Sequence, residues 1–529
     1  MIFDIPSIKY PVGVQAFSKM REVGYLYVDK TPWVWRLAND GSNVVFLSRP
    51  RRFGKSLMLS TLDAYFSGQK ELFEGLYIST VEKEWIEYPV FHFDFNLGLF
   101  KSVPDLVDVI DYYLRQFEEK YGLKYHREDD VSVCFSNLIT EVYNRTGQKV
   151  VILVDEYDKP ILNNVENKEL TKEIRDTLKS FYGVLKTCDP YIRFAMFTGV
   201  ARFAKVSIFS DLNNLKDISL EPEYNAICGI SESELNNYFS QSIEDLAKAL
   251  SISNQEAREK LKTNYDGYRF TKSPTAEGIY NPFSLMNCFT SNSISNYWLE
   301  TGTPTFLVKL MMKDGYDFSD SEIGASEDEL KGVNQMDFSP ISLMYQTGYY
   351  TIKKYDPEFH RYILGYPNRE VEVGFKTLTY NAYTLSRPLE FNIENFLRDL
   401  ETAHTDDFMR RLQSLLAKIP YEQAREVEAV YHNALYLLFT MLGYRTECEC
   451  SMNQGRTDMV VFTKRYIYVF EFKLNRSAAE AMAQINSRLY DSPYQSDGRR
   501  IIKVGVNFAS DRRNIESWVV ENAVPYEEL

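Results

Sequence analysis

The first part of the chain alternates short apolar runs with longer helical patterns. Continuous apolar runs cover residues 44–47, 150–154 and 194–197. Runs of this length without polar alternation are typical of strands that are buried on both faces of a parallel sheet. The alternation of strands and helices therefore predicts an α/β domain over residues 1–225.

Two further blocks follow. Residues 226–385 begin with helical patterns such as SESELNNYFSQSIEDLAKAL and continue to YYTIKKYDPEFHRYILGY, in which apolar alternation on both sides of a loop predicts a β-hairpin. We expect a mixed region, lid-like or winged-helix-like, and identify no chemistry in it. Residues 386–529 open with helices and continue with short strands, a helix and the strand IIKVGVNF, which predicts a second compact α/β domain.

Composition fits a large globular protein. The chain has 529 residues, of which 44% are hydrophobic and 15% aromatic. No apolar run reaches the roughly 18 residues of a membrane span, and MIFDIPSIKY lacks the features of a secretory signal, so we expect a cytoplasmic protein without a membrane partner. Six cysteines without C-x-x-C spacing are expected to be reduced.

The net charge of −14 argues against a protein that coats nucleic acid with its whole surface. Residues 464–513 are different, because they hold ten Lys or Arg against five Asp or Glu, a local balance of +5. A solvated basic face and a local nucleic-acid contact both remain open for this segment.

A phosphate-loop signature follows the first apolar run. In NVVFLSRPRRFGKSLMLSTLDAYF, a strand, a loop at 48–53 and a helix from about Gly54 succeed one another, as in a Walker A site. The second half of G-x-x-x-x-G-K-[ST] is present, but Arg replaces its first Gly. Lys55 is expected to reach the β and γ phosphates, and Ser56 to ligate Mg²⁺. The predicted nucleotide contacts in this loop are Arg49, Arg52, Gly54, Lys55 and Ser56.

Acidic and polar residues follow the other two apolar runs, and parallel strands place such residues at the ligand-binding edge of a sheet. In KVVILVDEYDKP, Asp155 fits the acid that holds Mg²⁺ through its water shell, and Glu156 the base that activates the attacking water. After IRFAMFTG, Thr198 is expected to orient water and Arg202 to sense the γ-phosphate by charge. An ordinary turn Thr and surface Arg remain the alternative.

A second candidate site lies in GRTDMVVFTKRYIYVFEFKL. If residues 464–465 form the turn of a hairpin, Asp458 faces Glu471 across two strands. Their Cβ atoms would lie about 4.5–5.5 Å apart, a like-charge pairing that is unfavourable without a cation between the carboxylates. Hard oxygen ligands favour Mg²⁺ or Mn²⁺.

Lys473 projects from the same face as Glu471 and is expected to hold the nucleophilic water or the phosphate. Asp458, Glu471 and Lys473 thus satisfy the pattern D-x(n)-E-x-K. The alternative is an exposed hairpin face on which the lysine merely pairs with one of the two acids.

Several phrases resemble the predicted AAA-ATPase-like family of bacterial proteins, namely YLYVDKT, RPRRFGKSL, VILVDEYDKPI, TGVARFAKVSIFSDLNNL, NYDGYRF and YNPFSLMN. In that family the first Walker glycine is commonly absent, and a PD-(D/E)XK domain usually follows at the C-terminus. The resemblance covers most of the chain. It implies a P-loop NTPase domain that uses ATP and Mg²⁺.

The C-terminal block is similar to the helix, hairpin, helix core of the PD-(D/E)XK superfamily, which has a restriction-endonuclease-like α/β fold. By that analogy Glu428 is an accessory metal ligand, whereas Gln484, as a member of the catalytic set, and Tyr490 contact the substrate backbone. Either Glu447 or Glu449 is expected near the metal, and the sequence does not choose between them.

These expectations combine into an ATP-hydrolysing protein with a metal-dependent nuclease domain, with DNA expected over RNA and homo-oligomers compatible with the sequence. The alternative is a nucleotide-gated signalling or defence switch whose C-terminal domain binds nucleic acid or protein without cleavage. A third hypothesis is a protein-remodelling ATPase with a C-terminal partner module.

Overall fold

The computed structural model describes residues 8–124, 130–165, 167–201, 208–209, 212–273, 275–298, 307, 323–331, 340–384, 393–417, 435–439, 444–452, 455–512 and 514–522. The chain forms two compact units. The first comprises Met1–Gly302 and Glu322–Val371, and the second comprises Thr303–Ser321 and Glu372–Leu529. The boundaries expected at 225 and 385 stay predictions.

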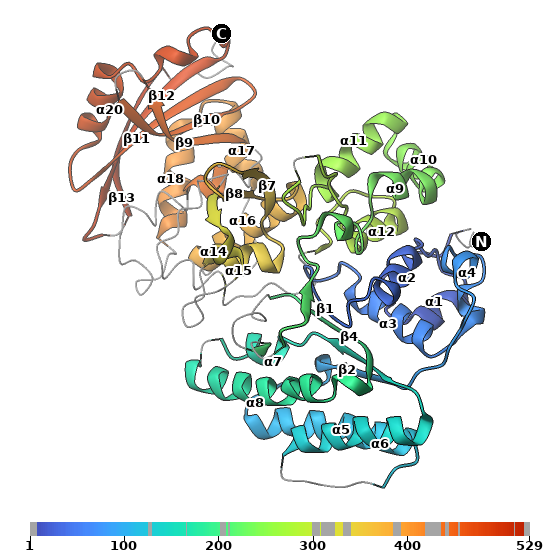
Figure 1. Ribbon diagram of the computed structural model, residues 1–529. Coiled ribbons are helices and arrows are strands. Elements are labelled where there is room, and N and C mark those ends of the chain that lie inside the picture. The colour runs from blue at the N-terminus through green and yellow to red at the C-terminus, as the bar shows by residue number, and fades with distance from the viewer. Residues whose placement is uncertain are drawn as a thin grey trace, which may run out of the picture. The chain divides into compact units, whose positions relative to one another are not determined.

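A five-stranded sheet forms the centre of the first unit (Figure 1). Its order is β2-β3-β4-β1-β5, and every pair of neighbouring strands is parallel. The strands are β1 (Val44–Ser48), β2 (Val90–Asp94), β3 (Val150–Asp155), β4 (Ile192–Gly199) and β5 (Leu215–Asp217). All residues of β1 and β3 are buried, which confirms the prediction of a parallel α/β sheet from the apolar runs.

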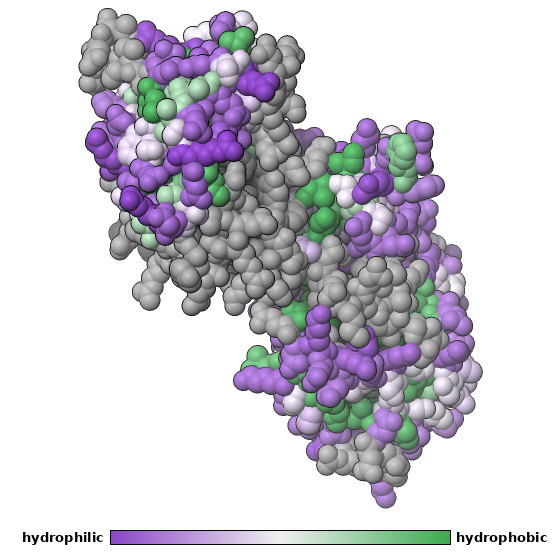
Figure 2. All heavy atoms as spheres, turned by 90° about the vertical axis from the view of Figure 1, so that its left-hand side faces the viewer, coloured by the Kyte–Doolittle hydropathy of each residue, from purple (hydrophilic) through white to green (hydrophobic). Residues whose placement is uncertain are grey.

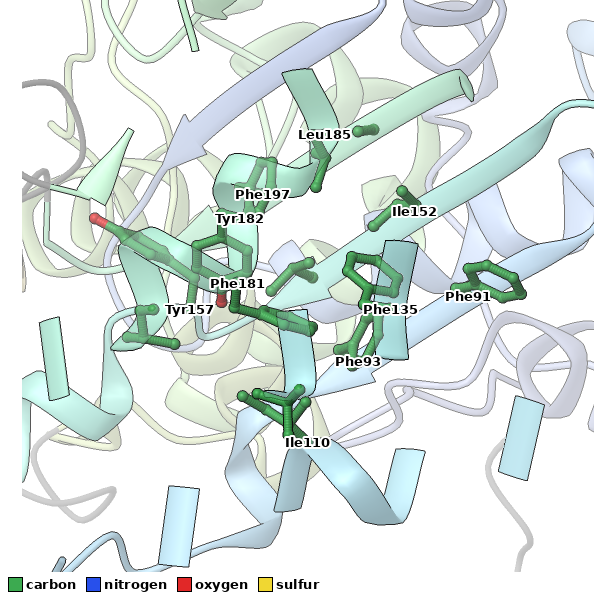
Figure 3. Packing of buried hydrophobic residues seen from close by; sticks show 14 of the residues in the cluster. Phe91, Phe93, Ile110, Phe135, Ile152, Tyr157, Phe181, Tyr182, Leu185 and Phe197 are labelled. Carbon is green, nitrogen blue, oxygen red and sulfur yellow. The ribbon is translucent and has the colours of Figure 1, made fainter. Parts of the chain in front are cut away.

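Helices cover both faces of this sheet. On one face, α5 (Val103–Lys120), α6 (Val131–Thr146) and α8 (Lys168–Thr187) enclose a core rich in aromatic rings, shown in Figure 3. Phe135 and Phe181 stack there with ring centroids 4.7 Å apart. On the other face, Phe66 of α3 (Lys55–Phe66) stacks on Phe194 of β4.

The first helices of the chain and several short ones complete this part of the unit. They are α1 (Phe17–Val23), α2 (Thr31–Asn39), η1 (Lys70–Phe73), α4 (Ile78–Val81), η2 (Phe95–Leu97), α7 (Lys159–Leu162), η3 (Asp189–Tyr191) and η5 (Pro222–Tyr224).

A second core in the first unit is helical. It joins α9 (Glu232–Tyr238), α10 (Ser240–Leu250), α11 (Asn254–Tyr265) and α12 (Pro282–Ser291). Capping boxes start α9 and α11. The hydroxyl groups of Ser231 and Ser253 accept from the N–H of the glutamate three residues on, and the carboxylate of that glutamate accepts from the N–H of the serine.

The expected hairpin after these helices is confirmed. Strands β7 (Thr351–Asp356) and β8 (Arg361–Gly365) are antiparallel, and β6 (Ile323–Ser326) pairs with β8. The helices α14 (Glu327–Lys331) and α15 (Pro340–Thr347) lie in the same part of the chain.

The second unit contains a mixed five-stranded sheet of order β13-β12-β11-β10-β9. Only β11 and β12 are parallel; the other neighbours are antiparallel. The strands are β9 (Arg445–Met452), β10 (Gly455–Phe462), β11 (Tyr466–Leu474), β12 (Arg500–Ala509) and β13 (Asn514–Glu521). The helices of this part are α16 (Arg369–Thr384), α17 (Ile393–Glu401), α18 (Thr405–Leu416), α20 (Ala478–Ser487) and the short η8 (Ser492–Tyr494).

The described surface is mostly hydrophilic on the face that Figure 2 shows. Figure 2 shows hydrophilic side chains over much of the described surface on one face, with smaller hydrophobic areas between them. None of the helices that the structure describes is long and apolar enough to cross a membrane.

Candidate functional site

The loop between β1 and α3 curls around the ammonium group of Lys55. This side chain is only 4% exposed, and its Nζ donates to the carbonyls of Arg49 at 3.1 Å and Pro50 at 3.2 Å. The helix starts at Lys55, directly after Gly54, whose φ of 97° lies in the left-handed region that favours glycine. The N–H groups and the positive end of the α3 dipole therefore face the loop, as an anion site requires.

A cavity of about 400 Å³ opens at this loop. Its volume is in the range of small-molecule sites. The polar part is lined by the start of α3 and by residues that follow β2 and β3: Gly54, Lys55, Ser56, Asp94, Asn96, Glu156 and Lys159. The apolar part includes Pro11, Val12, Met20, Pro282, Phe283 and Met286. Residues predicted from separate motifs thus meet in one cavity at the carboxyl edge of the sheet.

The charge of the lining is positive. Four cations (Arg51, Arg52, Lys55 and Lys159) stand against two acids (Asp94 and Glu156), which leaves a balance of +2. The guanidinium of Arg52 lies 5.1 Å from the centre of the Phe283 ring, at the border of the apolar part. Such a cavity suits an anionic ligand that also carries an apolar ring.

Asp155 and Glu156 take different positions at the end of β3. Asp155 is buried, and its Oδ1 accepts from the Thr198 hydroxyl at 2.6 Å and from the Glu156 N–H at 3.0 Å. Glu156 lines the cavity and has a φ of 51°, which a non-glycine residue seldom adopts. Thr198 is fully buried, and its hydroxyl donates to the carboxylate of Asp155; its predicted water-orienting role stays a prediction.

The side chain of Arg49, a predicted nucleotide contact, has protein partners in the structure, and its contact with the nucleotide stays a prediction. Its side chain is fully buried, and the guanidinium donates to the carbonyls of Ser48, Ser219 and Tyr224 at 2.7–2.9 Å. It also lies 4.1 Å from the centre of the Phe270 ring. Arg49, which replaces the first Walker glycine, therefore ties the loop to the segment after β5.

Asp158 is a buried acid that sequence reasoning missed. Its Oδ2 accepts from the N–H groups of Val200 at 2.9 Å and Ala201 at 2.5 Å, while Oδ1 has no hydrogen-bond partner in the part of the chain that the structure describes. Burial, and secondarily the charge of Glu156, raises the pKa of Asp158 to about 7, against the lowering effect of the bond from Ala201 and of Lys55. Through its hydrogen bonds with Val200 and Ala201, Asp158 fixes the two residues that follow β4.

Some predicted side chains lie outside the described residues. These are Arg202, Glu428 and the side chain of Glu449. Their predicted roles stay predictions.

The C-terminal hairpin has the predicted register. Its turn closes with a bond from the Thr463 N–H to the Tyr466 carbonyl at 2.9 Å, and the strands pair from Phe462↔Ile467 to Met459↔Phe470. The next position in this register places Asp458 opposite Glu471. At this position a side chain takes part in the pairing of the strands, because Oδ2 of Asp458 accepts a hydrogen bond from the Phe472 N–H at 2.7 Å.

Glu471 is a buried carboxylate beside a second carboxylate. It is 1% exposed; Oε1 accepts from Lys473 Nζ at 2.9 Å, and Oε2 has no hydrogen-bond partner among the described residues. Burial, followed by the charge of Asp458, raises the pKa of Glu471 to about 7, while Lys473 lowers it. The alternative of an exposed hairpin face expected Lys473 to pair with one of the acids. The ion pair with Glu471 is present, but Glu471 is buried.

This donor set fits a divalent cation. An orphaned buried carboxylate oxygen next to another acid is stabilised by a hard cation that shares both oxygens. Within the residues that the structure describes, no group of three His, Cys, Asp or Glu comes together as a metal site. Asp458 and Glu471 therefore form a two-carboxylate arrangement, and the expected further ligand, Glu428, lies outside the described residues.

Helix α20 covers the face that carries these acids. Met482 and Ile485 of the helix cluster with Val469, which lies two residues before Glu471 and on the same side of β11. Beneath the helix lies Gly505, the β12 partner of Glu471. A Cβ at Gly505 would lie 2.6 Å from the carbonyl oxygen of Ala478, so only glycine allows α20 to approach so closely.

Gln484 is partly exposed on α20, and its Nε2 donates to the Tyr490 hydroxyl at 3.3 Å. Tyr490 is buried in the same cluster, and its predicted contact with the substrate backbone stays a prediction. In the β9 register, Glu447 pairs with Val460, whereas position 449 falls opposite Asp458.

Comparisons with known proteins match two different families to the two parts of the chain that hold the candidate sites. Residues 11–209 match the family described as predicted AAA-ATPase, and residues 426–518 match the PD-(D/E)XK nuclease superfamily. An uncharacterized protein in the vnfD 5′ region of Azotobacter chroococcum mcd 1 is 35% identical over 527 residues, which cover 97% of this chain and 99% of that protein.

Two solved structures show a weaker likeness. The Aeropyrum pernix ORC2 protein is 12% identical, with 68% of this chain and 93% of that chain covered and a TM-score of 0.27. Cdc6p from Pyrobaculum aerophilum is 11% identical, with 72% and 97% covered and a TM-score of 0.21. Both scores are too low to support a conclusion about this chain. The family matches and the full-length relative suffice: the chain belongs to the predicted AAA-ATPase family and carries a PD-(D/E)XK nuclease superfamily domain at its C-terminus.

Proposed function

We propose that this protein binds and hydrolyses ATP at the start of α3 and cleaves nucleic-acid phosphodiesters with its C-terminal domain. The ATP half is supported by one observation above all: Lys55, Ser56 and Glu156 come from separate motifs and line the same cavity. The nuclease half is supported by the buried acid pair of Asp458 and Glu471 with Lys473 bonded to it.

In the ATP site, the nucleotide base lies against the apolar lining of Pro282, Phe283 and Met286. Lys55 exchanges its two loop carbonyls for phosphate oxygens, which gives the ammonium charged partners in place of neutral ones. Ser56 and Asp155 hold Mg²⁺, whose charge offsets that of the phosphates. Glu156 orients and deprotonates the attacking water at the cavity wall.

In the nuclease site, Asp458 and Glu471 hold Mg²⁺ or Mn²⁺, and Glu428 completes the ligand set. The metal would supply a water of lowered pKa and positive charge beside the phosphate. Lys473 Nζ, which lies 2.9 Å from Oε1 of Glu471, orients the water or the phosphate. Gln484 on α20 contacts the substrate backbone.

The test is cleavage of labelled single- and double-stranded DNA and RNA with Mg²⁺ or Mn²⁺, with and without ATP. Wild type is compared with Lys473→Ala and with Lys464→Ala, a lysine that is exposed at the turn of the same hairpin. We expect cleavage by the wild type and the control but not by Lys473→Ala. Lys55→Ala should lose ATP turnover, and Asp458→Ala should lose cleavage while it still hydrolyses ATP.

If no substrate is cleaved under any of these conditions, the nuclease half fails. ATP-dependent binding of nucleic acid or protein without cleavage would then favour the nucleotide-gated switch. Cleavage by Asp458→Ala at the wild-type rate would show that the hairpin acids are not the site.

A further inference from the structure

Lys159 is a cation of the ATP cavity that no phosphate-loop motif includes. It begins the short helix α7, four residues after the end of β3, and lines the cavity together with Asn96, which follows β2. Along the sheet, β3 is two strands and β2 three strands away from β1, which leads into the phosphate loop. At about 4.8 Å per strand, Lys159 therefore belongs to a part of the cavity roughly 10–14 Å from the end of β1.

The ammonium group of Lys159 is held by a neutral partner. Its Nζ donates to Oδ1 of Asn96 at 2.6 Å and approaches the Asn96 carbonyl at 3.4 Å. Asn96 is itself fixed, because its N–H donates to Oδ1 of Asp94 at 2.8 Å. Among the described residues, no carboxylate forms an ion pair with Lys159. The hydrogen-bond partner of the ammonium group in the described structure is thus neutral, and a phosphate oxygen would be a stronger one.

The arrangement of the lining fixes the direction of a bound nucleotide. The apolar side chains of Phe283 and Met286 take the base, and Gly54, Lys55 and Ser56 at the start of α3 take the first phosphates. Apart from Gln15 and the loop residues Arg51 and Arg52, the remaining polar lining lies at the ends of β2 and β3, and it holds the last phosphate of the chain. A diphosphate ends before it reaches this group, whereas a triphosphate extends to it.

We propose that Lys159, positioned by Asn96, contacts the terminal phosphate of a nucleoside triphosphate and makes the site distinguish the triphosphate from the diphosphate. This inference rests on the proposed ATP site. It assigns to Lys159 a contact with the terminal phosphate from the ends of β2 and β3, in addition to that of Lys55, which also reaches the β phosphate that both nucleotides carry.

The experiment measures the affinity of the full-length protein for ADP and for the non-hydrolysable triphosphate analogue adenylyl-imidodiphosphate, both with Mg²⁺, by titration calorimetry. Removal of one charge-assisted hydrogen bond weakens binding by about 10-fold or more. We expect Lys159→Ala to weaken the triphosphate analogue by this factor while the affinity for ADP changes less than about twofold.

Two further variants sharpen the result. Lys159→Arg keeps the charge and should retain most of the preference for the triphosphate, whereas Asn96→Ala should lose part of it. Lys248→Ala removes a lysine whose side chain is 73% exposed and should bind both nucleotides as the wild type does.

Equal weakening of ADP and the triphosphate analogue by Lys159→Ala would overturn the inference, since Lys159 would then contact a phosphate that both nucleotides share. Unchanged affinities for both would overturn it as well. In either case nucleotide binding by the wild type leaves the proposed ATP site standing. If the wild type binds neither nucleotide, the proposed ATP site fails and this inference fails with it.

Discussion

Thr198 donates a hydrogen bond of 2.6 Å to Oδ1 of Asp155. The bond joins the ends of the neighbouring strands β4 and β3, and the same oxygen also accepts the Glu156 N–H. Two donors on one oxygen fix the orientation of the carboxylate and direct its second oxygen elsewhere. Thr198 is therefore a positioning residue for the acid that is expected to hold Mg²⁺.

Thr198→Val removes this donor and keeps the shape of the side chain. We expect the turnover number for ATP to fall by about 10-fold, because Asp155 loses a hydrogen bond to a charged group, while the KM for ATP changes little. Thr198→Ser retains the hydroxyl and should stay near the wild type. Steady-state ATP hydrolysis by the three proteins decides the matter, and wild-type turnover by Thr198→Val would show that the bond does not matter.

Arg49→Gly restores the consensus Walker glycine and should nevertheless harm the protein. The change leaves the carbonyls of Ser48, Ser219 and Tyr224 without their buried donor, which costs about 3 kcal/mol or more. Arg52→Gly is the matched control, because Arg52 has a φ of 67° that glycine adopts without strain. Urea unfolding should show a large loss of stability for the first variant and a small change for the second; similar losses would contradict the structural role of Arg49.

A divalent metal should stabilise the C-terminal domain through Asp458 and Glu471. In nucleotide-free protein, Mn²⁺ at about 100 times its Kd would stabilise the folded state by about 2.7 kcal/mol. We expect a higher unfolding temperature for the wild type and little or no metal-dependent rise for Glu471→Gln. The variant removes one metal-binding charge but keeps the side-chain shape. An equal rise in both proteins would place the metal elsewhere.

Asp158 should make the stability of the first unit depend on pH. Its folded-state pKa of about 7 lies above the ordinary value of 3.8, so the folded protein binds the proton more tightly than the unfolded chain does. The resulting stabilisation is complete below about pH 4 and is lost as the pH rises to about 7. Asp158→Asn stays neutral, and the groups nearest to the carboxyl, Glu156, Lys55 and Tyr182, are unchanged.

The measurement compares thermal unfolding of wild type and Asp158→Asn at pH 5 and pH 8. The variant should gain on the wild type between pH 5 and pH 8 by about 2.7 kcal/mol, because the folded-state pKa lies about two units above pH 5. Glu370 and Glu471, whose pKa values are also raised to about 7, titrate in both proteins and cancel in the comparison. A difference that is independent of pH would show that the Asp158 carboxyl does not titrate in this range.

Local patterns predicted what depends on neighbours in the sequence. The pairing of Asp458 with Glu471 followed from a two-residue turn and strict alternation, because a hairpin register is set within about twenty residues. Strand–loop–helix order likewise located Lys55 at the cavity. In these cases one short segment contains all the information that the geometry needs.

Non-local contacts escaped prediction. The guanidinium of Arg49 donates to carbonyls some 170 residues away in the sequence. Nothing in RPRRFGKS distinguishes a buried arginine from one that binds phosphate. The middle block was expected to carry no chemistry, yet Phe283 and Met286 line the cavity. The sequence around Asp158 and Lys159 gives no sign of a buried acid or of a cavity residue. Burial and cavity lining depend here on strands that are distant in the sequence.

The lack of a side chain at Gly505 sets the distance between helix α20 and the sheet. The backbone atoms of Ala478 and Met482 occupy the space of its missing Cβ and cannot rotate away as a side chain would. Any larger residue at this position lifts α20, and Gln484 with it, off the sheet. The spacing between this helix and the acids of β10 and β11 is therefore set by β12, a strand that contributes none of the proposed metal ligands.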